Sequence, residues 1–160
     1  MLKEKLDVPF VHDLFNSVEA TLTDIFQCEV TRGRVYFWRN RLDEGEVAIL
    51  TGVVGDQHTG MIVYSMKGDT AHRMIGFLDP SVNPAQDRYD LYDGLGEIIN
   101  IISGNTILRF SKNNVVLNIT TPSVIAGGAV ELHMLNQATL SADMLSQFGT
   151  LKVNIAIKKY

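Results

Sequence analysis

The sequence has very little cysteine: Cys28 is the one cysteine in 160 residues. A single cysteine excludes an internal disulfide, and small disulfide-stabilised secreted domains need several. The opening residues M-L-K-E-K-L-D-V-P-F are charged and contain no long apolar run, unlike a secretory signal peptide. We therefore expect a protein of a reducing compartment and a cytoplasmic location.

Long hydrophobic runs are also missing. No stretch approaches the roughly 18 consecutive apolar residues that indicate a membrane-spanning helix. Hydrophobic residues still make up 46% of the chain and charged residues 20%, so a core can be buried and nothing indicates disorder. We expect a single domain over residues 1–160, with no membrane partner.

Positive charge is scarce, because 14 lysines and arginines face 18 acidic residues and give a net charge of -4. This balance argues against nucleic acid as the main partner. One segment, R-G-R-V-Y-F-W-R-N-R over residues 32–41, interleaves arginines with aromatics and has two interpretations. It could bind nucleic acid, or it could be an edge strand protected by charge, with its aromatics facing the core. Without a second basic cluster we favour the edge strand, in which Arg32 or Arg34 could also touch an acidic patch on a partner.

The usual patterns for metal and phosphate sites are absent from the sequence. The four histidines have no metal-ligand spacing with a cysteine or a carboxylate cluster: His12, His58, His72 and His133. The segments S-G-N-T and A-G-G-A lack the lysine of a phosphate-binding loop. Cys28 has no triad pattern around it and is expected to be a small buried residue. We predict no metal site and no cofactor of the protein's own.

Hydrophobic periodicity predicts helices and strands along the whole chain. In the first half we expect a helix over 8–27, strands over 28–39, 46–55 and 59–67, and a short helix over 70–78 with Asp69 as its N-cap. In the second half we expect a helix over 88–110, a strand over 115–122, a loop or broken strand over 124–130, and a hairpin of 138–145 with 151–157.

These elements form a unit that occurs twice: one amphipathic helix followed by about three antiparallel strands. The first unit covers about 8–67 and the second about 88–158. Short connections favour antiparallel pairing, and the apolar helix faces must pack on the sheet. The predicted fold class is therefore α/β in the α+β sense, a mostly antiparallel sheet covered by helices and built from two pseudo-repeated halves.

The long second helix contains D-G-L-G-E-I-I-N-I-I-S-G-N, residues 93–105. At about 100° per residue, one arc gathers the apolar side chains: Leu91, Leu95, Ile98, Ile99 and Ile102. Asp93, Glu97, Asn100 and Gly104 form a ridge on the opposite side, flanked by Gly94 and Ile101. Glu97 and Asn100 are neighbours on it, roughly 5 Å apart at their Cβ atoms.

A polar ridge opposite an apolar arc is usually a solvated face. This ridge, however, contains no lysine or arginine, and its glycines leave room for another backbone to approach. Ile101 adds an apolar contact that the core does not need. We therefore interpret four positions as partner-binding: Asp93, Gly94, Ile101 and Gly104.

The stretch G-E-I-I-N-I-I-S-G-N resembles the E-x-x-N helix of the CheC/CheX/FliY chemotaxis phosphatases, and specifically their CheX branch. The later T-P-S-V-I-A-G-G and F-G-T-L-K-V segments are similar as well. The resemblance implies a CheC-like fold and a homodimer formed through strand pairing. The first helix has Glu19, but Leu22 stands where the asparagine should be and Phe26 where the glycine should be, so one active site per chain is implied.

The resemblance implies a hydrolase that removes phosphate from the aspartyl phosphate of a CheY-like response regulator, in chemotaxis or a related two-component pathway. Asn100 would orient the attacking water, and Glu97 would pair with a lysine of the regulator. The Mg²⁺ in this chemistry belongs to the phosphorylated regulator. The alternative is a non-catalytic module that binds a response regulator or a flagellar-switch component on the same helix.

Overall fold

The computed structural model describes residues 6–38, 41–43, 45–81, 88–111, 114–126, 128, 130–133 and 138–160. The first half contains α1 (Val8–Phe26), β1 (Thr31–Phe37), β2 (Arg41–Leu42), β3 (Glu46–Gly55) and β4 (His58–Lys67). Helix α2 (Gly68–Leu78) follows, and the second half contains α3 (Arg88–Ser111), β5 (Leu117–Ile119), β6 (Ser123–Ala126), β7 (Val130–Glu131), β8 (Leu140–Ser146) and β9 (Gly149–Lys159).

The main sheet is antiparallel, with strand order β1-β8-β9-β4-β3-β5, and β6 also pairs with β3. Two hairpins, β3–β4 and β8–β9, lie at its centre and join through the β4–β9 pairing. The first strand of each half pairs with the hairpin of the other: β1 with β8, and β5 and β6 with β3. This exchange confirms the two predicted halves and shows that they form one inseparable sheet.

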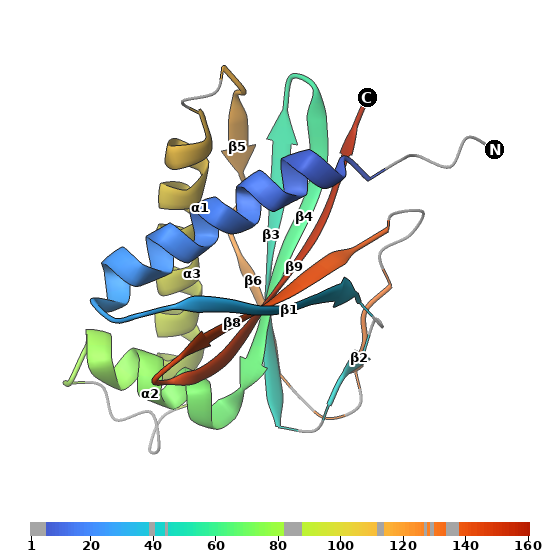
Figure 1. The fold of residues 1–160 in the computed structure, drawn as a ribbon. Coiled ribbons are helices and arrows are strands. Elements are labelled where there is room, and N and C mark those ends of the chain that lie inside the picture. The colour runs from blue at the N-terminus through green and yellow to red at the C-terminus, as the bar shows by residue number, and fades with distance from the viewer. Residues whose placement is uncertain are drawn as a thin grey trace.

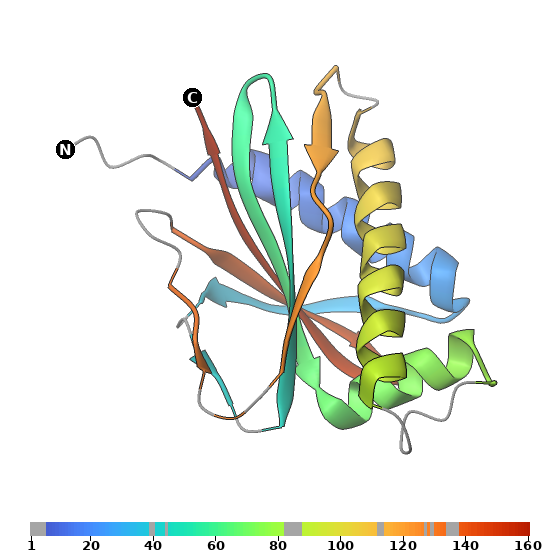
Figure 2. The same cartoon turned by 180° about the vertical axis from the view of Figure 1, so that it is seen from behind.

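All three helices pack against one face of the sheet, as the two opposite views show (Figure 1, Figure 2). Strand β9 explains this sidedness, because Leu151, Val153, Ile155 and Ile157 alternate with more polar residues and join the helix-side core. Helix α1 also crosses α3 directly. Its first turn is capped by Asp7, whose carboxylate accepts a hydrogen bond of 3.2 Å from the Phe10 backbone N–H.

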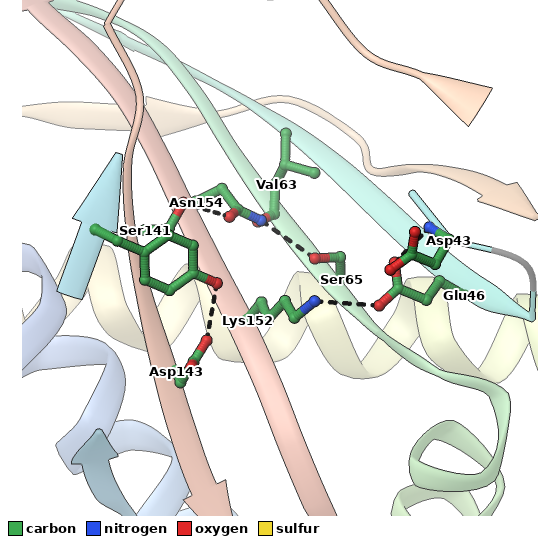
Figure 3. A network of polar contacts seen from close by, with 9 residues as sticks. Asp43, Glu46, Val63, Ser65, Ser141, Asp143, Lys152 and Asn154 are labelled. Carbon is green, nitrogen blue, oxygen red and sulfur yellow. Dashed lines mark hydrogen bonds and ion pairs between the residues drawn. The ribbon is translucent and has the colours of Figure 1, made fainter. Parts of the chain in front are cut away.

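The face of the sheet away from the helices carries a buried polar network (Figure 3). Asn154 is its centre, since its amide donates to the Val63 carbonyl at 2.8 Å and its oxygen accepts from the Ser141 hydroxyl at 2.7 Å. Lys152 donates to the buried Glu46 carboxylate at 3.2 Å. These bonds connect β8, β9, β4 and β3, and the cost of an unpaired buried polar group fixes their register.

Two local predictions need correction. Helix α2 begins at Gly68, so Asp69 lies in its first turn; the N-cap is Lys67, without a capping side chain. Strand β1 is at the sheet edge as predicted, but its aromatics do not face the helix-side core. Tyr36 donates to Asp143 on the other face, and Phe37 is 68% exposed. Of the two alternatives predicted for 124–130, a loop or a broken strand, the structure shows the broken strand, as β6 and β7.

No helix among the described residues is long and apolar enough to cross a membrane.

Candidate functional site

The polar ridge lies on the outer face of α3. Asp93, Glu97, Asn100 and Ile101 are exposed, and Gly94 and Gly104 are half-buried. The opposite side of the helix holds the predicted core residues Leu91, Leu95, Ile99 and Ile102, all buried. Ile98 is only partly buried and packs at the margin of the core. The helical face predicted from the sequence is therefore correct, with Ile98 displaced to its edge.

Two buried polar contacts fix the rotation of α3 about its axis. The hydroxyl of Ser103 lies 3.0 Å from the hydroxyl of Tyr64 on β4. One turn further, the Thr106 hydroxyl donates to the Thr21 hydroxyl on α1 at 3.5 Å. Both contacts are on the core side, so they hold Asn100 on the solvent side. Sequence periodicity gave no sign of them, because hydroxyls in an apolar arc are ordinary in helices.

The side chains of the ridge are available to a partner. Among the described residues, Asp93, Glu97 and Asn100 have no side-chain hydrogen bond or ion pair with one another or with a neighbour. The described part of the chain also contains no cluster of histidine, cysteine and acidic residues able to hold a metal ion. An exposed amide and a carboxylate can place a water molecule and pair with a cation.

The two ridge glycines have different surroundings. A Cβ atom at Gly94 would lie 2.9 Å from Cδ1 of Ile75, so the missing side chain lets α2 approach α3 closely. A Cβ atom at Gly104 would meet nothing within 4 Å. Gly94 therefore has a use inside the fold, which the sequence interpretation did not foresee. Gly104 has no such internal use and leaves open space on the ridge.

A groove runs along the ridge on the side of Glu97. Its volume is about 340 Å³, and helices α1, α2 and α3 form its walls. We call it the three-helix groove; it is lined by Ile25, Ile75, Leu78, Asp79, Gly94, Glu97, Ile98 and Ile101. Three of these residues belong to the predicted site, and the other five were missed. These five residues line the groove because of how the three helices pack together, and the hydrophobic pattern of a single helix carries no information about that packing.

Helix α1 offers no second copy of the ridge. Leu22 and Phe26, which replace the asparagine and glycine of the pattern, are each 2% exposed and point into the core. Glu19 does lie near the surface, but Arg32 of β1 pairs with it at 3.6 Å and donates to Asn16 beside it. The polar face of α1 is thus tied to the edge strand, which agrees with a single site per chain.

Residues 47–144 match the model of the family described as chemotaxis phosphatase CheX. The match covers more than half of the chain and includes the whole ridge of α3. The chain belongs to the CheX family. No curated protein sequence matches it.

Solved structures of CheX and CheC-like proteins share the fold. A CheC-like superfamily protein from Shewanella sp. PV-4 has a TM-score of 0.78 at 20% identity, covering 96% of this chain and 99% of that one. A CheX from Desulfovibrio desulfuricans has a TM-score of 0.76 at 20% identity, with 95% and 99% covered. The CheX of a CheX–CheY–BeF3–Mg²⁺ complex from Borrelia burgdorferi has a TM-score of 0.71 at 22% identity, with 93% and 97% covered.

Proposed function

We propose that this CheX-family protein hydrolyses the aspartyl phosphate of a CheY-like response regulator. The observation that carries the proposal is the ridge of α3, where Glu97 and Asn100 are exposed on a rigid helix and engaged by no described neighbour. The family match supports the reaction class. The Borrelia burgdorferi complex supports the kind of partner, because a CheX of the same fold is bound there to CheY.

The chemistry asked of the chain is positioning. The oxygen of a water molecule attacks phosphorus, the bond from phosphorus to the aspartate oxygen breaks, and inorganic phosphate leaves with the water's protons shared between it and solvent. The aspartate of the regulator is restored as a carboxylate. Asn100 would accept a hydrogen bond from this water and hold it in line with the bond that breaks, a contribution that can reach 10²-fold or more. Mg²⁺ is part of the phosphorylated regulator, not of this chain.

Glu97 would pair with a lysine of the regulator. Glu97 and Asn100 are three residues apart on α3, so their side chains project from neighbouring positions on one face. Because the lysine would lose water on docking, the pair would anchor the regulator and orient its phosphorylation site toward Asn100. Asp93, Ile101 and Gly104 would then form the rest of the contact along the ridge.

A homodimer formed by strand pairing is part of the proposal. Strand β1 is an edge of the main sheet and carries exposed apolar side chains, with Phe37 68% and Val35 38% exposed. Unpaired backbone groups and apolar side chains on an edge strand favour pairing with another strand. Sedimentation of the chain and of a Val35→Lys, Phe37→Lys variant measures this, with a dimer expected only for the unmodified chain.

The deciding experiment incubates the purified protein with each phosphorylated response regulator of the same genome and follows the loss of phosphate. Accelerated loss from one or a few regulators is expected, whether they act in chemotaxis or in another two-component pathway. A regulator that binds with unchanged phosphate lifetime would instead indicate the alternative, a binding module without turnover.

A further inference from the structure

Glu97 and Asn100 cannot by themselves choose one regulator over another. Under the proposed function, on which this inference rests, they act on an acyl phosphate and a lysine, and these groups recur wherever this chemistry takes place. Discrimination between partners needs contacts that differ from one partner to the next. Such contacts must lie close to Glu97 and Asn100 and must involve parts of the regulator other than the acyl phosphate and the lysine.

The three-helix groove is the surface that meets this condition. It begins at Glu97 itself and extends from the ridge over α1 and α2. Its walls are mainly aliphatic, from Ile25, Ile75, Leu78, Ile98 and Ile101, and Ile101 is 49% exposed. Its volume of about 340 Å³ is near the lower end of the roughly 300–1,000 Å³ of small-molecule pockets. A hollow this small and apolar suits protruding side chains of a docked protein.

The charge at the groove has a single sign. The two charged residues among its lining are both acidic, Asp79 at the end of α2 and Glu97 on α3. Asp93, one turn before Glu97, adds a third exposed carboxylate. Hydrogen bonds from the hydroxyl and the backbone N–H of Ser81 lower the pKa of Asp79, so this carboxylate stays ionised. A complementary partner segment therefore combines an apolar side chain with basic neighbours.

The groove is also built into the fold. Gly94 lacks the Cβ atom that would lie 2.9 Å from Ile75 Cδ1, and this brings α2 against α3. Ile75 is buried at the floor while Leu78 is only partly buried. The apolar walls thus follow from the packing of the three helices.

We infer that the three-helix groove receives an apolar side chain of the regulator, next to the lysine that pairs with Glu97, and that this contact selects which regulator is dephosphorylated. The occupant is a side chain of the same partner, because the groove and the ridge share Gly94, Glu97 and Ile101. Leu78 and Asp79 are then specificity residues that take no part in the hydrolysis.

The test compares Leu78→Gln with Val54→Gln, a matched change at a 52% exposed valine on β3 outside the groove. The probe is the regulator dephosphorylated fastest: its Mg²⁺- and BeF3-loaded form gives Kd, and its phosphorylated form gives KM and kcat. Truncating an apolar anchor at the centre of an interface typically weakens binding at least about tenfold. We expect Leu78→Gln to raise Kd and KM by at least that factor, to keep kcat, and to reduce the preference among regulators, while Val54→Gln changes none of them.

Asp79→Lys is the second variant, at an exposed position that folding of the core does not require. It is expected to weaken binding several-fold at low salt, with a smaller effect at high salt, and it decides the question if Leu78→Gln does not fold. Wild-type affinity in both variants would overturn the inference while leaving the proposed function intact. Altered dimerisation with unchanged regulator binding would overturn it as well, by assigning the groove to a second copy of the chain. A wild-type protein that binds no regulator would instead remove the proposed function itself.

Discussion

The hydroxyl of Tyr64 on β4 lies 3.0 Å from the hydroxyl of Ser103 on α3, and both side chains are shut off from solvent. Ser103 follows Asn100 by three residues and lies about 60° from it around the helix, on the buried side, while Asn100 is exposed. This contact therefore connects the central sheet to the rotation of the helix that carries the site. Removing this contact should lower the free energy of unfolding and change the orientation of the ridge on α3.

Tyr64→Phe is expected to lower the free energy of unfolding by about 1–3 kcal/mol, because the Ser103 hydroxyl loses its buried partner. Urea denaturation measures the change. Tyr160→Phe is the control, since Tyr160 is 74% exposed. Equal stability of the two variants would show that the Tyr64 hydroxyl does not hold α3 in place.

Alkaline pH should destabilise the protein through two tyrosines, the buried Tyr64 and the half-buried Tyr36. Burial raises the pKa of Tyr64 to about 12, and burial together with Asp143 raises the pKa of Tyr36 to about 12. The unfolded chain releases these protons near pH 10, so their stabilising contribution is complete below that pH and is lost as the pH rises toward 12. The loss for Tyr64 is up to about 1.4 kcal/mol per pKa unit. Denaturation curves between pH 8 and pH 12 should show falling stability, with a shallower fall in Tyr64→Phe.

The two ridge glycines should respond differently to the same substitution. Gly94→Leu would drive a side chain into Ile75 and is expected to cost about 1–3 kcal/mol of stability. Gly104→Leu meets open space and should be neutral or stabilising by up to about 1 kcal/mol.

Binding separates the two models of Gly104. If this position admits the regulator, Gly104→Leu keeps the melting temperature and yet prevents the complex, because leucine occupies the space of the partner's backbone. A stable Gly104→Leu protein that binds the regulator normally would show that Gly104 does not serve docking.

Glu97→Gln is expected to weaken regulator binding by about 2–5 kcal/mol if the partner's lysine is desolvated, and to slow turnover with it. The matched control is Glu29→Gln, at an exposed glutamate before β1. Titrations at low and high salt should show a reduced salt dependence for Glu97→Gln alone. Affinity and salt dependence equal to those of the control would rule out the ion pair.

The helical face of α3 could be predicted because it depends only on the spacing of residues within one element. Leu95, Ile99 and Ile102 are buried, and Glu97 and Asn100 are exposed, as the periodicity indicates. The two halves of the fold could be predicted for the same reason, because each helix and each hairpin has its own hydrophobic periodicity. Which hairpin each first strand joins was not visible, because that choice depends on contacts between the halves.

The missed features all arise between elements. Ile25, Ile75 and Leu78 are unremarkable within their own helices and form a groove only where α1, α2 and α3 meet. The helical pattern predicts that Gly94 leaves room for a partner, but Ile75 of α2 packs into that space within the fold. The strand pattern predicts that Tyr36 faces the core, whereas its hydroxyl donates to Asp143 on the opposite face of the sheet. Single-element patterns cannot contain such information.

The most direct measurement is the rate of phosphate loss from the regulator with Asn100→Ala, determined beside its affinity for the Mg²⁺- and BeF3-loaded regulator. Asn100 is exposed on α3, so the variant should fold like the wild type. Asn118→Ala, at an exposed asparagine on β5, is the control. If Asn100 orients the water, turnover falls by 10²-fold or more while Kd stays within a few-fold of wild type. Turnover close to that of the control, at similar affinity, would contradict the proposed role of Asn100.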